Sequence, residues 1–167
     1  MKIRIVGGCG SGKTYIARQL AKRYGIPHVQ TDNLVWDRSD DTKYPEATRD
    51  RMLNEIVGQS SWIIEGVHHK WGTIRYAEAD YIFIIRAPLA VQNLRTLKRF
   101  VKTRLGLEAC NYKQSLSNLR EMFGWNRNFE RDNMVNILAL TETYLAKRYI
   151  VRRNTEIMDI LPNGDEE

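Results

Sequence analysis

The first 25 residues constrain the fold more than any other part of this sequence. Lys2 to Val6 alternates apolar and basic side chains and then meets glycines, a pattern typical of a short strand that ends in a tight turn. The next eight residues, GGCGSGKT, match the phosphate-loop pattern G-x-x-x-x-G-K-[ST] at every position. Thr14 to Tyr24 then has its apolar residues on one helical face, and Gly25 follows to end the helix. This order of strand, loop and helix predicts a site for a nucleoside triphosphate.

The residue types in this loop suit phosphate binding. Glycines let successive backbone N–H groups converge on phosphate oxygens, and the helix N-terminus adds the positive end of its dipole. Lys13 supplies a mobile positive charge for the β- and γ-phosphates, and the Thr14 hydroxyl can bind Mg²⁺. We read Cys9 as a small loop residue rather than a nucleophile. The residues expected to bind ATP are Gly7, Gly8, Cys9, Gly10, Ser11, Gly12, Lys13 and Thr14.

The rest of the chain predicts an open parallel sheet. Short apolar runs at His28–Thr31, Trp62–Ile64, Tyr81–Ile85 and Tyr149–Val151 suit strands that are buried on both faces. Helical patterns separate these runs, which implies right-handed crossovers and a three-layer α/β/α domain. No linker rich in Pro, Gly or Ser divides the sequence, so we expect one domain over residues 1–167. In such sheets ligands bind at the carboxyl ends of the strands.

The second half contains one long helical pattern and one irregular stretch. Residues 89–105 predict a basic amphipathic helix, and residues 106–126 are the least periodic part of the chain. Residues 134–145 predict another helix, and residues 162–167 an acidic tail. The apolar residues expected to face inward from the basic helix are Leu94, Leu97, Val101 and Leu105.

Composition restricts the class of protein. The 167 residues contain two cysteines, so a small disulfide-stapled domain is excluded. No apolar run approaches the roughly 20 residues of a membrane span, and the N-terminus has no long apolar core of a secretory signal. We therefore expect a cytoplasmic protein.

Charge is concentrated in the second half. Residues 86–153 carry 14 basic and 5 acidic side chains, against 12 and 10 in residues 1–85 and none and 5 in residues 154–167. The net charge of +9 in residues 86–153 suits a polyanionic partner, either nucleotide phosphates or a nucleic acid. A helix surface that only faces solvent would give the same charge pattern.

Two acidic residues follow predicted strands. Asp32 comes after the strand at His28–Thr31, and Glu65 comes after the strand at Trp62–Ile64. Both are expected at the sheet edge that carries the phosphate loop, with Glu65 holding Mg²⁺ and Asp32 accepting a proton from the acceptor. The alternatives are an Asx turn or helix cap for Asp32 and a solvated loop carboxylate for Glu65.

Arginines of the second half occur in pairs spaced by one helical turn. Arg95 and Arg99 form one pair, and Arg127 and Arg131 form the other. Guanidinium groups neutralise phosphoryl oxygens better than ammonium groups do, so these arginines are candidates for the site, although some must be ordinary surface. His68-His69 is not expected to bind a metal, because adjacent residues seldom face one ion and no third ligand is apparent.

With these residues placed, the chain resembles the adenylate-kinase-like group of small P-loop kinases. Within that group it is similar to the bacterial DNA topology modulation proteins. The resemblance implies five parallel strands in the order 2-3-1-4-5 and a mobile lid at about residues 105–127. It also implies lid-side roles for Arg95 and Arg99 and transition-state roles for Arg127 and Arg131. We therefore expect Arg95 to bind ATP, and Arg99, Arg127 and Arg131 to stabilise the transferring phosphoryl group. The segments that carry the likeness are GGCGSGKT, IPHVQTDNLVW, SSWIIEGVHHKWGTIRYAEADYIFIIRAP, NLRTLKRF and NRNFERDN.

The sequence thus predicts an ATP- and Mg²⁺-dependent kinase of a small molecule, with a nucleotide or nucleoside as the favoured acceptor. Asp32 as a base favours a hydroxyl acceptor, including one that is not a nucleotide, whereas the arginines favour a phosphate acceptor. The alternative from another class is a nucleotide-gated regulator that binds DNA through the basic segment, although no recognisable DNA-binding motif is present.

Overall fold

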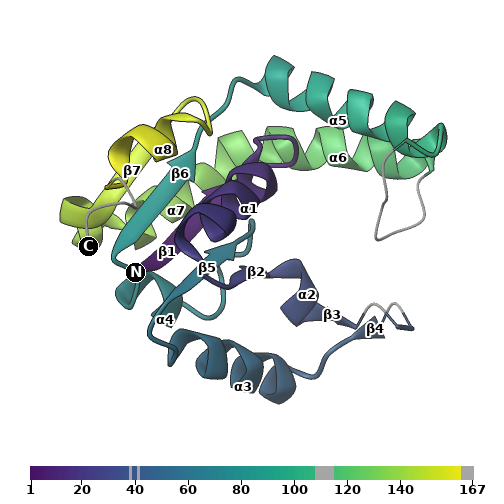
Figure 1. Cartoon of the computed structure of the whole chain (residues 1–167). Helices are drawn as coiled ribbons and strands as arrows, with labels where there is room; N and C mark the ends of the chain where they lie inside the picture. Colours follow the sequence, from purple (N-terminus) through teal and green to yellow (C-terminus); the bar gives the residue numbers. More distant parts are fainter. Residues whose placement is uncertain (38, 41, 108–114, 163–167) are drawn as a thin grey trace.

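The chain is built around a five-stranded parallel sheet (Figure 1). The computed structural model describes residues 1–37, 39–40, 42–107 and 115–162. Counted along the chain within this sheet, the strand order β2-β5-β1-β6-β7 is 2-3-1-4-5, so the predicted fold class is confirmed. The strands are β1 (Lys2–Gly7), β2 (His28–Gln30), β5 (Trp62–Glu65), β6 (Tyr81–Ile85) and β7 (Arg148–Val151).

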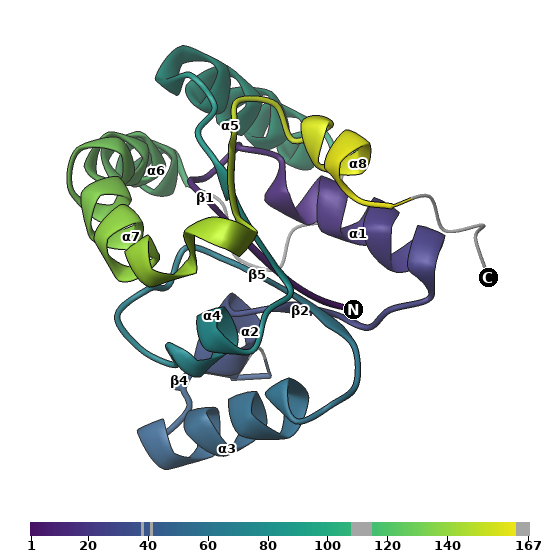
Figure 2. The ribbon, with the colours of Figure 1, turned by 90° about the vertical axis from the view of Figure 1, so that its left-hand side faces the viewer.

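Helices cover both faces of the sheet and make the three layers (Figure 2). On one face lie α1 (Lys13–Tyr24) and α8 (Glu156–Ile160). On the other lie α3 (Glu46–Val57), the short α4 (Ile74–Ala77) and α7 (Met134–Leu140). Each face has its own hydrophobic core, because successive strand residues point to opposite sides.

The strands feed these two cores alternately. In β6, Phe83 and Ile85 pack under α1 and α8, whereas Ile82 and Ile84 pack under the helices of the opposite face. All four side chains are fully buried. Their burial explains why the sequence of this strand is a continuous apolar run rather than an alternating one.

Strand register aligns the carboxyl ends of three neighbouring strands. Glu65 at the end of β5 pairs with Ile5 of β1 on one side and with Gln30 of β2 on the other. The residues that follow these strands therefore emerge together at one edge of the sheet. This edge holds the phosphate loop, Asp32 and Glu65, as predicted.

Helix α5 (Leu89–Arg104) forms where the sequence predicts it, but the prediction of its inward face is wrong. Leu94, Leu97, Val101 and Leu105 are between 42% and 66% exposed. The buried residues of the helix are Gln92, Thr96 and Phe100. The physical reason is that α5 packs against the phosphate loop, where polar side chains are needed, so the requirements of the loop override the apolar periodicity.

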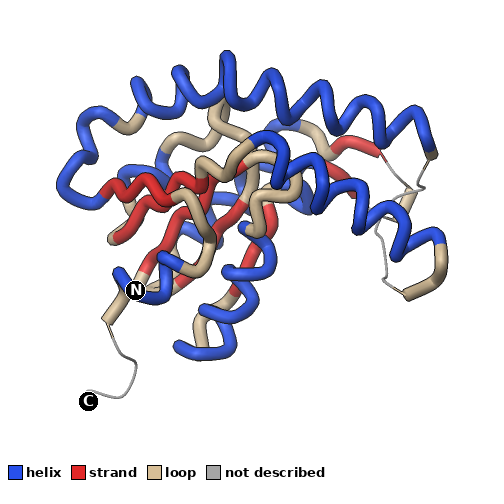
Figure 3. Tube along the Cα trace, turned by 90° about the horizontal axis from the view of Figure 1, so that it is seen from above, coloured by secondary structure: helices blue, strands red, loops and turns tan. Residues whose placement is uncertain are grey.

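Residues 116–140 form one helical run, which Figure 3 shows as a rod across the molecule. It consists of α6 (Leu116–Asn128), a π-helical turn (Phe129–Asn133) and α7. The irregular structure predicted up to Asn126 is wrong from residue 116 onward. Helix α6 begins there because the Ser115 hydroxyl accepts a hydrogen bond from the Asn118 N–H at 3.1 Å. Of the predicted lid, residues 108–114 lie outside the described residues.

Smaller elements complete the fold. After β2 come α2 (Asp32–Val35) and an antiparallel hairpin of β3 (Trp36–Asp37) and β4 (Thr42–Lys43), which the sequence did not predict. The predicted helix at 134–145 ends early, and a 3-10 helix (Glu142–Lys147) leads into β7. In the part of the chain that the structure describes, no helix has the length and apolar character needed to cross a membrane. Most of the acidic tail, residues 163–167, lies outside the described residues.

Candidate active site

The phosphate loop connects β1 directly to α1. Gly10 and Gly12 have φ angles of 71° and 90°, a conformation that favours glycine, and Gly12 is the residue before the first turn of the helix. A Cβ at Gly10 would overlap the backbone carbonyl oxygen of Gln92, so α5 lies directly against the loop. The glycines are therefore required both for the turn and for the close packing behind it.

Side chains from other elements hold the loop from outside. Arg95 of α5 donates a hydrogen bond from Nη1 to the Ser11 carbonyl oxygen at 3.3 Å. Asn154, which follows β7, donates from Nδ2 to the Gly12 carbonyl oxygen at 3.3 Å. Sequence reasoning found Arg95 but missed Asn154, because no motif precedes it and it joins the loop only through the tertiary fold.

Lys13 lies over the loop that contains it. Its Nζ donates to the Gly8 carbonyl oxygen at 3.3 Å, which places the ammonium group above the loop backbone. The left-handed glycine conformations and this ammonium group are the features that a phosphate-binding loop needs, so the residues present fit the phosphates of a nucleoside triphosphate.

Thr14 and Glu65, which the sequence predicts as Mg²⁺ ligands, are hydrogen-bonded to each other. The Thr14 hydroxyl donates to Glu65 Oε1 at 2.7 Å, and Glu65 is 2% exposed. His28 Nε2 of β2 lies 3.8 Å from the same carboxylate oxygen. Hydroxyl and carboxylate oxygens are the ligands that Mg²⁺ prefers, so this pair fits the ion beside the phosphates.

The environment of Glu65 favours its ionised form. Burial works to raise the pKa of this carboxyl, but His28, Lys13 and Thr14 together outweigh burial and hold the pKa below its ordinary value. The carboxylate is therefore charged at neutral pH, as a role in binding Mg²⁺ requires.

Glu65→Gln is expected to change how stability depends on pH. A carboxyl whose pKa is lowered on folding stabilises the protein above its ordinary pKa of 4.5, and this contribution is lost as the pH falls through the lower folded-state value. The difference between the urea unfolding midpoints of wild type and Glu65→Gln should therefore shrink as the pH falls from about 7 to about 3. Glu55→Gln, at an exposed position of α3, is the matched control. A gap that stays constant over this range would contradict the lowered pKa.

Asp32 lies next to this pair and is joined to a residue that sequence reasoning did not assign to the site. Asp32 begins α2, and its Oδ1 lies 3.1 Å from Nε2 of His68, three residues beyond Glu65. The Asp32 side chain is 51% exposed, so a ligand can reach its carboxylate. The sequence offered no signal for this contact beyond the position of His68 in the loop after β5.

The remaining predicted arginines lie on α5, on α6 and in the π-helical turn. Arg99 Nη2 contacts Met122 Sδ of α6 at 4.0 Å, and Arg127 is exposed on α6. Arg131, in the π-helical turn, makes a two-pronged contact with Asp132, at 2.9 Å from Nε and 2.8 Å from Nη2. Of the predicted arginines, Arg95 thus donates to the phosphate loop, and Arg131 is bound to its neighbour Asp132.

No group of three or more His, Cys, Asp or Glu side chains that could hold a metal occurs within residues 1–37, 39–40, 42–107 and 115–162.

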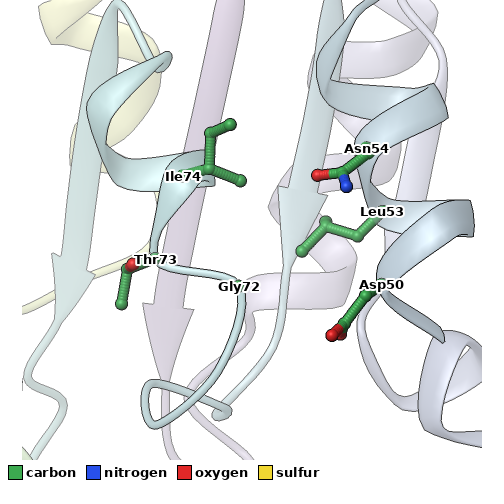
Figure 4. A pocket seen from close by; sticks show the side chains of 6 residues that line it. All are labelled: Asp50, Leu53, Asn54, Gly72, Thr73 and Ile74. Atoms are coloured by element: carbon green, nitrogen blue, oxygen red, sulfur yellow. The ribbon is translucent and has the colours of Figure 1, made fainter. Parts of the chain in front are cut away.

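A pocket of about 260 Å³ lies apart from the phosphate loop, between α3 and the start of α4 (Figure 4). Its lining contains no residue of the phosphate loop and consists of Asp50, Leu53, Asn54, Gly72, Thr73 and Ile74.

Comparison with known families agrees with this geometry. Residues 3–114, more than half of the chain, match the AAA domain family AAA_18. The chain belongs to this family. The AAA domain family is a P-loop NTPase, kinase-like family, and the match includes the phosphate loop, Asp32 and Glu65. The protein is therefore a nucleotide-binding P-loop protein of the kinase-like kind. No curated protein matches the sequence.

Proposed function

We propose that this protein is an ATP- and Mg²⁺-dependent phosphotransferase that acts on a small acceptor of the nucleotide or nucleoside class. The observation that carries the proposal is the arrangement at the strand ends: the phosphate loop, the Thr14–Glu65 pair and the accessible carboxylate of Asp32 lie along one edge of the sheet. Phosphoryl transfer needs these three parts, which hold the phosphates, hold the cation and face the acceptor.

Each residue has a role that its position supports. Lys13 and the loop N–H groups hold the β- and γ-phosphates, and Arg95 supports the loop backbone. Thr14 and Glu65 hold Mg²⁺, whose charge offsets that of the phosphates when it is bound. Asp32 faces the acceptor and takes its proton.

The predicted arginines act on the transferring phosphoryl group. Arg99, Arg127 and Arg131 lie on α5, on α6 and in the π-helical turn, and they stabilise this group when ATP is bound. For Arg131 this requires release from Asp132, to which it is bound in the structure.

The test is ADP release from ATP and Mg²⁺ with two pools of acceptors. One pool contains nucleoside monophosphates, and the other contains nucleosides and small polyols. We expect one pool to raise the rate at least about tenfold over the rate without acceptor, because a positioned acceptor competes effectively with water. If neither pool raises the rate, the proposed function is wrong, and nucleotide-gated DNA binding becomes the function to test.

A further inference from the structure

We propose that His68 positions Asp32 toward the acceptor, and that the atom which receives the phosphoryl group is a hydroxyl oxygen rather than a phosphate oxygen. This inference rests on the proposed function and goes beyond it by naming the chemistry of the acceptor. The juxtaposition that carries it is the contact of 3.1 Å between His68 Nε2 and Asp32 Oδ1 at the edge of the sheet.

The two residues come from neighbouring strands whose ends are level. Asp32 follows β2 and His68 follows β5, and these strands pair in register through Gln30 and Glu65. The Thr31 N–H also donates to the Glu65 carbonyl oxygen at 2.8 Å, directly before Asp32. The backbone that leads into Asp32 is thus held against the strand end that carries Glu65.

Two buried arginines fix the backbone from which His68 projects. Arg4 and Arg75 are both 0% exposed. Arg4 Nη2 donates to the carbonyl oxygen of His68 at 3.1 Å, and Arg75 Nη2 donates to the same oxygen. Arg75 Nη1 also donates to the carbonyl oxygens of Trp71 and Gly72, at 2.7 and 2.9 Å. We call residues 66–72 the anchored loop, because these guanidinium groups hold its backbone.

The anchoring matters because a positioning group must itself be held. A donor on a mobile loop would restrict Asp32 little, because the donor would move as well. The loop backbone at His68 is held, since its carbonyl oxygen accepts hydrogen bonds from two guanidinium groups. The imidazole of His68 therefore contacts Asp32 from a backbone that is held in place. One carboxylate oxygen accepts from Nε2–H, and this contact restricts the rotation of the whole carboxylate.

Charge beside His68 and Asp32 favours a hydroxyl acceptor. An acceptor phosphate needs cations around it, but Arg4 and Arg75, whose guanidinium groups bind the His68 carbonyl oxygen, are buried and bind backbone carbonyl oxygens. Arg49 stacks on Trp71 at 4.4 Å and is paired with Asp50 at 3.2 Å. The group that His68 holds toward the acceptor is a carboxylate, which repels a phosphate and accepts the proton of a hydroxyl.

The transfer step balances without another reactant. The acceptor oxygen forms a bond to the γ-phosphorus of ATP, and the bond from that phosphorus to the bridging oxygen of ADP breaks. The proton of the acceptor hydroxyl passes to the carboxylate of Asp32. His68 keeps its own proton throughout and acts only through its hydrogen bond to Asp32.

The chemistry of the product tests the acceptor class. Wild-type protein is incubated with ATP, Mg²⁺ and each of the two pools, and the products are analysed by ³¹P NMR. Transfer to a hydroxyl gives a phosphate monoester, whereas transfer to a phosphate gives an anhydride. We expect a monoester, including any formed on a sugar hydroxyl of a nucleotide. An anhydride as the only product overturns the inference while leaving the proposed function intact, and no product from either pool overturns the proposed function itself.

Variants at position 68 test the positioning role on whichever acceptor is turned over. His68→Leu removes the donor and is expected to lower kcat about tenfold to a hundredfold with KM changed less than about threefold, because loss of orientation affects the transition state more than binding. His68→Gln keeps an N–H donor near the place of Nε2 and is expected to recover most of kcat. Lys70→Ala, an exposed change in the anchored loop, is the matched control.

Coupling to Asp32 completes the test. If His68 acts through Asp32, then Asp32→Asn combined with His68→Leu should be no slower than Asp32→Asn alone. Thermal melting of each variant checks that it folds. A His68→Leu variant with wild-type kcat overturns the positioning role. A His68→Gln variant as slow as His68→Leu also overturns it, because the donor alone would then not account for the effect.

Discussion

Lys13→Ala is expected to lower the rate of ADP formation in the presence of an acceptor by about a hundredfold or more, the usual effect of removing one group that stabilises a transition state. In the proposed mechanism Lys13 supplies a point charge at the β- and γ-phosphates, where negative charge changes most during transfer. Its Nζ donates to the Gly8 carbonyl oxygen, a contact within the phosphate loop, so we expect the fold to tolerate the substitution. The melting temperature should stay within about 2 °C of wild type, since a small loss of free energy shifts it by only a few degrees.

The matched control is Lys22→Ala, an exposed lysine near the other end of the same helix. This variant changes the same charge on α1 without touching the phosphate loop. Its rate should remain within about twofold of wild type, because exposed surface changes seldom perturb a protein by more than about 0.5 kcal/mol. If Lys13→Ala retained a comparable rate, the phosphates would have to be held in another way and the site would need to be reassigned.

Arg75→Met is expected to destabilise the protein strongly. The substitution keeps a long side chain but leaves the carbonyl oxygens of Trp71 and Gly72 without their guanidinium donor, and it leaves the His68 carbonyl oxygen with Arg4 as its guanidinium donor. Unpaired buried polar groups cost about 1–3 kcal/mol each, so we expect a total loss of about 3 kcal/mol or more. For a chain of this size that loss lowers the melting temperature by about 6–12 °C.

Arg75 is also an unusual cation. Burial and the nearby charge of Arg4 lower the pKa of Arg75 to about 9, which still leaves the guanidinium protonated at neutral pH. Its ring contacts, at 5.0 Å from Trp71 and 5.4 Å from Tyr76, offset part of the cost of burying the charge. Arg51→Met, at an exposed position of α3, is the matched control. A shift of less than about 2 °C for Arg75→Met would mean that the anchored loop does not depend on this guanidinium.

Local sequence patterns were enough to predict most of the fold. The phosphate loop was found because the loop conformation itself demands glycines at Gly10 and Gly12, and that demand is visible as a motif. Strands such as β6 were found because burial on both faces demands a continuous apolar run. The strand order came from the resemblance, and the structure confirms it.

The features that the sequence did not predict share a physical cause. Each depends on a contact between residues that are far apart in the chain. The inward face of α5 was wrong because its buried Gln92 and Thr96 serve the phosphate loop rather than an apolar core. Arg4 was taken as part of an alternating strand, yet it is buried because the carbonyl oxygens of the anchored loop surround its guanidinium. The contact of His68 with Asp32 joins positions 36 residues apart, which no local pattern reports.

The anchored loop has a consequence for how this protein can diverge. Its guanidinium anchors bind backbone carbonyl oxygens, which every amino acid carries, and Gly66, His68, Trp71 and Gly72 are held in this way. The path of the loop therefore depends little on an exposed side chain such as that of Lys70. Substitutions at such a position can accumulate without disturbing the scaffold, so the surface that a ligand would meet beside Asp32 can change while the strand ends that carry Thr31 and Glu65 stay in place.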